Sequence, residues 1–270
     1  MTKTILKMYT DLPVVISNPI LVDLSSSSQD SEDDPNDYTI SRVPLTCVRI
    51  EDERILSSFR ALVLSDMHFN QKEKLSFSLP IVLRKISKLI IDQNINIIFL
   101  LGDIVEQYQS PTSAEDLKTV FSAFEQLGIP IYIIPGNHDR SLFNNTSYDT
   151  RFKNIHLLKT TLMFIENPNS PPNTYRRIYM AHEMENNFKL EGPQKNVFPI
   201  KLKEFFKDVF TENDFLLIGH IHRHILDLSK NCGSVGQYSY DYKRESYAII
   251  TNENGFKIDF INEPEFSIPE

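Results

Sequence analysis

The sequence predicts an α/β domain with largely parallel strands, and three observations carry that prediction. Short apolar runs rich in β-branched residues alternate with longer segments whose apolar residues recur at helical spacing. Glycine, proline and polar residues mark the turns between them. Polar residues of the kind that bind metal ions directly follow five of the apolar runs. Parallel strands bring their carboxyl ends to one edge of a sheet, so we expect those polar residues to converge there.

The composition limits the class of protein. At 270 residues the chain is long enough for one large α/β domain. Its formal net charge of −8 gives a nucleic-acid backbone no overall electrostatic attraction. The two cysteines, Cys47 and Cys232, are too few for a disulfide framework and fit a reducing compartment. We find no apolar signal core and no run of membrane-spanning length, and therefore expect a cytoplasmic protein without a membrane partner.

Residues 1–58 read as an N-terminal extension that adds edge strands to a domain over residues 59–270. Strand-like patterns occupy residues 12–16, 20–24 and 38–50. Residues 25–37 are rich in serine and aspartate and have no apolar anchor. Such a segment cannot bury enough surface to offset its ordering entropy, so we expect a mobile acidic loop there.

A β-α-β-α-β pattern begins at residue 59. We expect strands at residues 60–65, 97–101 and 129–134, and helices at residues 79–91 and 113–127. Ser113 with Asp116 is a plausible helix-capping arrangement, and Gly128 ends that helix. The crossovers should be right-handed, which makes the three strands parallel.

The second half of the chain is expected to contribute further strands and one helix. The strands are predicted at residues 177–181, 214–218, 224–228, 246–251 and 256–261, and the helix at residues 199–210. The last two strands should form an antiparallel hairpin, because Asn252-Glu-Asn-Gly255 between them is a turn sequence.

The polar residues that follow the apolar runs form a set of potential metal ligands. The set comprises Asp66, His68, Asp103, Asn137, His182, His220 and His222. A lone histidine is usually structural, but five of the seven histidines follow these runs directly, and this favours one shared metal site. Nitrogen and oxygen ligands without a thiolate suit Mn²⁺ best, with Fe or Zn²⁺ as alternatives.

Seven ligands are more than one ion with an open position requires, so we expect two divalent ions that share a carboxylate. Paired ions hold a hydroxide between them and clamp the oxygens of a displacement at phosphorus. The leaving alkoxide then needs a proton, and His138 is the spare imidazole. Asp139 beside it is expected to orient the ring and raise its basicity.

These residues resemble the five signature blocks of the calcineurin-like metallophosphoesterase superfamily. The blocks are Asp66-x-His68, Gly102-Asp103, Gly136-Asn-His-Asp139, His182 and Gly219-His-x-His222. The resemblance covers residues 59–261 and implies a four-layer sandwich of two packed mixed sheets flanked by helices, with the metal site at the carboxyl ends of the strands.

The resemblance also implies a division of the ligands between the two ions. One ion would be held by Asp66, His68 and His222. The other would be held by Asn137, His182 and His220. Asp103 would bridge the two ions, and His138 with Asp139 would act on the leaving group.

Within the superfamily, Gly233-Ser-Val-Gly-Gln237 and Ser246-Tyr-Ala-Ile-Ile250 resemble the C-terminal signature of small bacterial and archaeal metal-dependent phosphodiesterases. A metal-poor scaffold branch belongs to the same group. Pro-Arg usually follows the glutamine, whereas Tyr238-Ser-Tyr stands here. The protein Ser/Thr phosphatases carry other residues where this chain has Glu106 and Asp139, which argues against that branch.

Four further residues are weaker candidates. Arg140 could reach a phosphate oxygen or form a surface ion pair, and His224 continues the alternation of His220 and His222 toward a substrate. His156 is the rival of His182 as the ligand of the fourth block, but only His182 ends a strand-like run. Cys232 is expected to be a small buried residue.

We therefore expect a dinuclear metal-dependent phosphohydrolase acting on a phosphodiester or a small phosphorylated metabolite. Two alternatives stay open: a catalytically weak scaffold of the same fold that binds a protein partner, and a nuclease. A nuclease predicts a basic groove beside the site, which the acidic composition disfavours.

Overall fold

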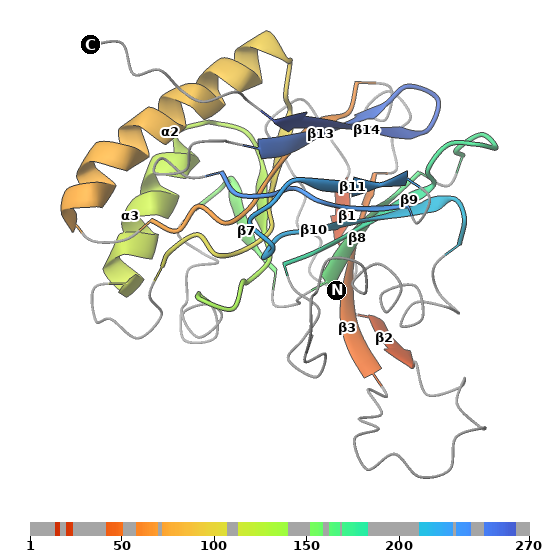
Figure 1. The fold of residues 1–270 in the computed structure, drawn as a ribbon, viewed down its shortest axis with the longest axis horizontal. Helices are drawn as coiled ribbons and strands as arrows, with labels where there is room; N and C mark the ends of the chain where they lie inside the picture. Colours follow the sequence, from red (N-terminus) through yellow and green to blue (C-terminus); the bar gives the residue numbers. More distant parts are fainter. Residues whose placement is uncertain are drawn as a thin grey trace.

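The structure, a computed structural model, describes the greater part of the chain in twelve segments. They are residues 14–16, 20–23, 42–50, 58–69, 72–106, 113–139, 152–158, 162–167, 169–182, 211–228, 231–238 and 246–262. Two β-sheets pack together, and two helices lie side by side across the outer face of one of them (Figure 1). No helix among these segments has the length and apolar character needed to cross a membrane.

The first sheet has six strands and contains the predicted β-α-β-α-β unit. Its order is β14 (Phe256–Asn262), β13 (Ser246–Asn252), β4 (Arg60–Leu64), β5 (Ile97–Leu100), β6 (Ile131–Ile133) and β7 (Ile155–Leu157). Strands β4 to β7 are parallel, and β13 and β14 form an antiparallel hairpin. The predicted parallel strands and the predicted C-terminal hairpin are confirmed, and β7 is an additional strand.

Helices α2 (Lys72–Asp92) and α3 (Ser113–Glu125) cover the outer face of this sheet. Helix α3 begins at the predicted Ser113 and carries Glu115 and Asp116 in its first turn, where acidic groups complement the helix dipole. Helix α2 begins earlier than predicted and contains Pro80. Leu75 and Leu79 are both buried in the core, so the apolar stripe extends through the proline, which itself faces outward.

The second sheet has eight strands, seven of which form a continuous series with β2 beside β3. The series is β1 (Val14–Ile16), β3 (Arg42–Ile50), β8 (Leu162–Glu166), β9 (Arg177–Ala181), β10 (Asp214–Ile218), β12 (Cys232–Ser234) and β11 (Ile225–Asp227), and β2 spans Ile20–Asp23. The strand expected at residues 224–228 is β11, and β12 is an additional short strand that follows it.

Strand β3 joins the N-terminal residues to the rest of the second sheet. It pairs antiparallel with β1 and β2 and parallel with β8. The three strands expected in residues 1–58 are therefore present, and β3 lies inside the sheet while β1 and β2 lie at its edge. The acidic segment 25–37 lies outside the described residues, and the division at residue 58 stays a prediction.

Alternate residues of β4 face two different cores. Leu62 and Leu64 pack under the helices, whereas Ala61 and Val63 pack between the sheets. A strand buried on both faces is typical of a parallel sheet covered on each side. The described residues thus form three layers: helices, the six-stranded sheet and the eight-stranded sheet. The helix expected at residues 199–210 lies outside them.

Candidate metal centre

All seven predicted ligands lie just past the carboxyl ends of strands, but the strands belong to both sheets. Asp66, His68, Asp103 and Asn137 follow β4, β5 and β6 of the six-stranded sheet, and His182, His220 and His222 follow β9 and β10 of the eight-stranded sheet. The site therefore lies where the ends of the two sheets meet, because each sheet supplies only part of the set.

The loops after β4 and β5 continue the pairing of the strands beyond the sheet. The amide of Asp66 donates to the carbonyl of Gly102 at 3.2 Å, and the amide of His68 donates to the carbonyl of Asp103 at 2.9 Å. These hydrogen bonds fix the backbone of both loops in the same register as the strands. The first two ligand blocks consequently form one rigid unit.

Five of the ligands have a left-handed backbone. They are Asp66, His68, Asp103, His220 and His222, with φ between 48° and 61°. The other non-glycine residues of the described chain with positive φ are all asparagines, and Asn, Asp and His enter this region more often than other side chains. Each strained residue costs about 1–3 kcal/mol, and such strain gathers at functional sites. The fold thus holds these five side chains in place at the expense of stability.

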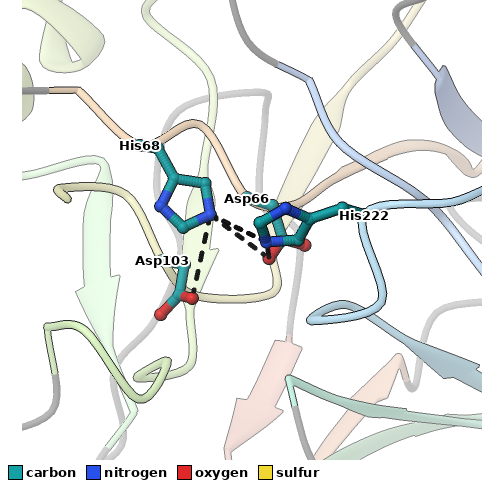
Figure 2. Close-up of side chains that lie close together, drawn as sticks. All are labelled: Asp66, His68, Asp103 and His222. Atoms are coloured by element: carbon teal, nitrogen blue, oxygen red, sulfur yellow. Dashed lines mark hydrogen bonds and ion pairs between the residues drawn. The ribbon is translucent and has the colours of Figure 1, made fainter. Parts of the chain in front are cut away.

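Asp66, His68, Asp103 and His222 form the first cluster (Figure 2). The Nε2 atom of His222 lies 3.2 Å from Oδ1 of Asp66 and 3.0 Å from Nε2 of His68. The Nε2 atom of His68 lies 3.7 Å from Asp66 Oδ1 and 3.9 Å from Asp103 Oδ2. Two carboxylate oxygens and two ring nitrogens therefore face one point.

Asp103, His182, His220 and Asn137 form the second cluster, and the Asp103 carboxylate belongs to both. The Nε2 atom of His182 lies 3.1 Å from Asp103 Oδ2 and 2.9 Å from Asn137 Oδ1. His220 Nδ1 lies 3.0 Å from the same Asn137 oxygen. The other ring nitrogen of His182 donates to the carbonyl of Leu101, so Nε2 is the atom turned toward the cluster.

The carboxylates of both clusters are ionised, and their inner oxygens face the ring nitrogens at ion-pair distance without forming a hydrogen bond. Burial alone would raise the pKa of Asp66, but the imidazoles of His222 and His68 hold it well below its usual range. The pKa of Asp103 is lowered in the same way by His182. Asp66 Oδ1 and Asp103 Oδ2 are buried and accept no hydrogen bond. A divalent cation at each cluster would satisfy these oxygens, so the residues fit two metal ions.

The same negative charges act on the histidines. Burial alone would lower the pKa of His182, but Asp103 and Asp66 raise it to about 9. The pKa of His68 is raised by Asp66, Asp103 and Glu106 against the effect of its burial. A cation that binds here must therefore displace protons from these rings.

His138 stands beside the clusters and not within them. Its side chain is partly exposed, and its ring Nδ1 donates to the carbonyl oxygen of Glu106. Its Nε2 therefore faces the site, 4.0 Å from Asp103 Oδ2. The backbone amide of His138 donates to the other Asp103 oxygen at 2.9 Å. The Nε2 atom of His138 thus lies beside Asp103 without belonging to either of the two clusters described above.

The prediction that Asp139 orients the His138 ring is wrong. The Asp139 carboxylate is fully buried and accepts the amides of Ile104 and Gly136, both at 2.7 Å. Burial raises its pKa to about 6, which leaves the group ionised at neutral pH. Consecutive side chains of the turn diverge, so Asp139 ties the turn after β6 to the loop after β5.

Gly136 permits a close approach between two loops of the site. A Cβ atom at this position would lie 2.1 Å from Oδ1 of Asp103 and 2.3 Å from its amide nitrogen. Since the amide nitrogen belongs to the backbone, it cannot move aside as a flexible side chain could. Only glycine therefore allows the turn after β6 to pack directly against the shared ligand.

The structure gives His224 and His156, two of the weaker candidates, aromatic stacking partners. The His224 ring stacks on Phe260 at 5.2 Å, so the prediction that it points with His220 and His222 is wrong. The strand alternation on which it rested does not apply, because His220 and His222 lie in left-handed turns. Arg140 lies outside the described residues. The rival ligand His156 lies on β7 and stacks on Tyr132 at 4.9 Å, and Cys232 is buried as expected.

Sequence reasoning missed Glu106 as a site residue. Its carboxylate Oε2 lies 2.8 Å from Nδ1 of His68, and its carbonyl accepts the proton of His138. The only signal in the sequence was its position three residues after Asp103, in the same loop.

The structure has two packed mixed sheets, and the carboxylates and imidazoles gather at the carboxyl ends of their strands. This is the fold and the site of a metallophosphoesterase. The chain belongs to the calcineurin-like phosphoesterase family, whose model matches residues 59–261. A comparison with curated proteins finds no match.

Several solved structures resemble the chain at low identity. A dimetal phosphatase from Danio rerio is 10% identical with a TM-score of 0.45, over 78% of this chain and 100% of the other. The protein TT1561 of Thermus thermophilus is 14% identical with a TM-score of 0.42, over 75% and 98%. The nuclease MPE of Pseudomonas putida is 13% identical with a TM-score of 0.37, over 73% and 85%.

Proposed function

We propose that this protein is a dinuclear metal-dependent phosphohydrolase acting on a phosphodiester or a small phosphorylated metabolite, with Mn²⁺ as the preferred ion. The observation that carries the proposal is that two ligand clusters share the Asp103 carboxylate. A shared carboxylate is the arrangement that holds two cations a few ångströms apart.

Each of the two clusters would bind one cation. Asp66, His68 and His222 would hold one cation, Asn137, His182 and His220 the other, and Asp103 both. When bound, the cations supply positive charge for the phosphoryl oxygens and lower the pKa of water toward neutrality. The left-handed backbones of Asp66, His68, Asp103, His220 and His222 keep the donor atoms in position before any cation arrives.

His138 is the proton donor for the leaving group. Its Nδ1–H is engaged by the Glu106 carbonyl, so a proton on Nε2 would point into the open side of the site. Its partial exposure leaves room for a substrate oxygen beside it. A proton passed from Nε2 to the departing oxygen would leave the neutral ring with its remaining proton on Nδ1, where the carbonyl stabilises it.

A scaffold role accounts less well for these residues. A protein that only binds partners does not require two sets of ligands, five strained backbones and two buried carboxylate oxygens that accept no hydrogen bond. These features are costly unless a cation occupies the clusters, which supports catalysis over a scaffold. A nuclease function has no specific observation in its favour among the described residues.

The test combines metal stoichiometry with two chromogenic substrates. Chelator-treated protein should bind two Mn²⁺ ions per chain in calorimetric titration. The loaded protein should hydrolyse bis(p-nitrophenyl) phosphate or p-nitrophenyl phosphate, and the ratio between them would distinguish diesterase from monoesterase activity. A single fully coordinated ion, or two bound ions without hydrolysis of either substrate, would contradict the proposal.

A further inference from the structure

The exposed apolar side chains of the described chain concentrate just after the last proposed ligand. Among the described residues, four large apolar side chains are exposed: Ile91, Ile225, Leu226 and Leu228. Three of them, with exposed fractions of 41%, 45% and 65%, follow the ligand block that ends at His222. A single exposed apolar residue is ordinary on a protein surface, but a group of them marks a binding surface.

Strand β11 places this group at the end of the eight-stranded sheet that carries the site. Ile225 pairs with Ser234 of β12, and Ser234 pairs with Ile218, the last residue of β10. The ligand block with His220 and His222 follows Ile218 directly. Ile225 is therefore level with the strand end from which these ligands project, two strands away, or roughly 10 Å at the usual strand spacing.

The backbone between His222 and Ile225 is held against the sheet. A Cβ atom on Gly236, in the loop after β12, would lie 3.0 Å from the amide nitrogen of His224 and 3.2 Å from the carbonyl carbon of Arg223. The His224 ring stacks on Phe260, with centroids 5.2 Å apart. The apolar group is thus fixed in position relative to the ligands.

Arg223 adds a positive charge at the end of this group nearest the ligands. It is the only lysine or arginine in the described segment 211–228, its side chain is exposed, and no described carboxylate pairs with it. Its Cα lies about 3.8 Å from that of His222, the spacing across any trans peptide bond. A guanidinium group binds phosphate oxygens strongly. We call Arg223, Ile225, Leu226 and Leu228 the β11 strip.

We propose that the β11 strip binds the organic part of the substrate, and that the substrate is a phosphate ester of an apolar alcohol. The phosphate group would lie between the proposed cations and Arg223, and the apolar chain would extend over Ile225. This inference rests on the proposed function and deepens it, because it names the class of substrate.

Two other occupants fit the strip less well. A second copy of the chain would have to pair with β11, which spans only three residues, Ile225–Asp227. A stable interface buries more than about 1,000 Å², which so short an edge does not supply. A lipid surface is bound through several lysines and arginines beside the apolar residues, whereas the described segment 211–228 carries one.

The experiment measures the binding of alkylphosphonates to Mn²⁺-loaded protein by calorimetry, with chains from methyl to octyl. These probes keep the phosphoryl oxygens and carry the chain on a C–P bond that is not hydrolysed. Affinity should rise about two- to fourfold for each methylene that the strip covers.

Variants separate the apolar contact from the charge. Ile225→Ser should weaken octylphosphonate binding about tenfold and change methylphosphonate binding less than about twofold. Ile91→Ser is the matched control, because this exposed residue lies in the last turn of α2. Arg223→Ala should weaken both probes equally, by about tenfold, whereas Arg84→Ala, also exposed on α2, should change neither. Mn²⁺ titration should be the same in all four variants.

Affinity that is independent of chain length, or an equal loss in Ile225→Ser and Ile91→Ser, would overturn the inference while leaving the proposed function intact. A dimer in sedimentation that Ile225→Ser abolishes would overturn it in favour of a second copy. Binding to phosphatidylcholine–phosphatidylserine vesicles that Ile225→Ser abolishes would overturn it in favour of a lipid surface.

A failure of the proposed function can be told apart from a failure of this inference. If the wild type binds no Mn²⁺, the proposed function fails. Methyl NMR shifts of the metal-free protein then still test the strip. Octylphosphonate should shift the Ile225 signal and leave the Ile91 signal in place, and an unchanged Ile225 signal would overturn the inference.

Discussion

The Nε2 atoms of His68 and His222 lie 3.0 Å apart, although 154 positions separate the two residues in the sequence. Two ring nitrogens at this distance share at most one proton, and Asp66 faces both of them. Each histidine also has a left-handed backbone. A pair held this way at the expense of stability is best explained by a cation that binds both rings.

Replacing the proposed acid should slow the reaction without removing metal. His138→Asn should leave two Mn²⁺ ions bound, because no ligand is lost, while the rate falls by about 10²–10⁴, the range for general acid–base catalysis. The loss should shrink for aryl esters, whose leaving group needs little help from an acid. Metal content and kcat on alkyl and aryl substrates check this. A variant that loses metal, or slows both substrates equally, would show that His138 is not the acid.

Replacing the shared carboxylate should affect both ions. Asp103→Asn removes the negative charge that faces both clusters and also lowers the pKa of His182. We expect weaker binding at both sites in Mn²⁺ titration, in contrast to one site for a ligand of a single cluster such as His222→Asn. Loss of one ion alone in Asp103→Asn would mean that the carboxylate does not bridge.

The metal-free protein should lose stability as the pH rises from about 6.5 to about 9. The pKa of His182 is raised from 6.5 to about 9 in the folded chain, so its ion pair with Asp103 stabilises the fold fully below the unfolded pKa. That contribution is lost as the pH rises through the folded value. Thermal unfolding in chelator should show the decline, and the decline should be smaller in His182→Asn.

With Mn²⁺ present the trend should reverse, because protons compete with the cation for the ring and metal affinity rises with pH. A melting temperature that is independent of pH in chelator would contradict the assigned ion pair.

Adding one methyl group beside Asp103 should weaken metal binding. Gly136→Ala would place Cβ 2.1 Å from Asp103 Oδ1, so the shared carboxylate must move. We expect Mn²⁺ affinity to fall by about 10- to 100-fold, as for other losses of ligand alignment. Gly128→Ala is the matched control. Its Cβ meets no atom within 4 Å, but its φ of 72° costs about 1–2 kcal/mol of stability. Equal metal affinity in both variants would contradict the role of Gly136.

The ion pair between Arg177 and Asp214 should matter for stability alone. Asp214 is fully buried at the start of β10, accepts two bonds from the guanidinium at 2.9 and 2.7 Å, and also accepts two bonds from Thr211. Asp214→Asn should cost about 1.5–3 kcal/mol of unfolding free energy, because the partly buried guanidinium of Arg177 loses its charged hydrogen-bond partner, while the amide oxygen keeps part of the network.

Metal binding should be unchanged in Asp214→Asn, since the pair lies at the opposite ends of the strands from the site. Lys257→Ala, in an exposed pair, should change stability little. Denaturant unfolding and Mn²⁺ titration of both variants check this. An unchanged denaturation midpoint in Asp214→Asn, or weaker Mn²⁺ binding by it, would contradict the prediction.

Much of the fold and the ligand set could be read from local sequence. The apolar run Ile97–Leu101 and the turn residues after it report a buried strand because strand formation and burial follow from neighbouring residues. The capping pattern at Ser113 placed the start of α3 for the same reason. Once the strands are parallel, topology alone brings Asp66 and Asp103 to one edge.

The tertiary structure alone decided where side chains point at the ends of those strands. Asp139 follows His138 directly, yet it turns into the interior to bind two backbone amides. The His224 ring stacks on Phe260. The strand alternation is broken before it, because His220 and His222 each have a left-handed backbone. Glu106 gains its place behind His68 through loop pairing between β4 and β5. One backbone angle redirects a side chain, and the sum of distant contacts that sets the angle is not encoded in any local pattern.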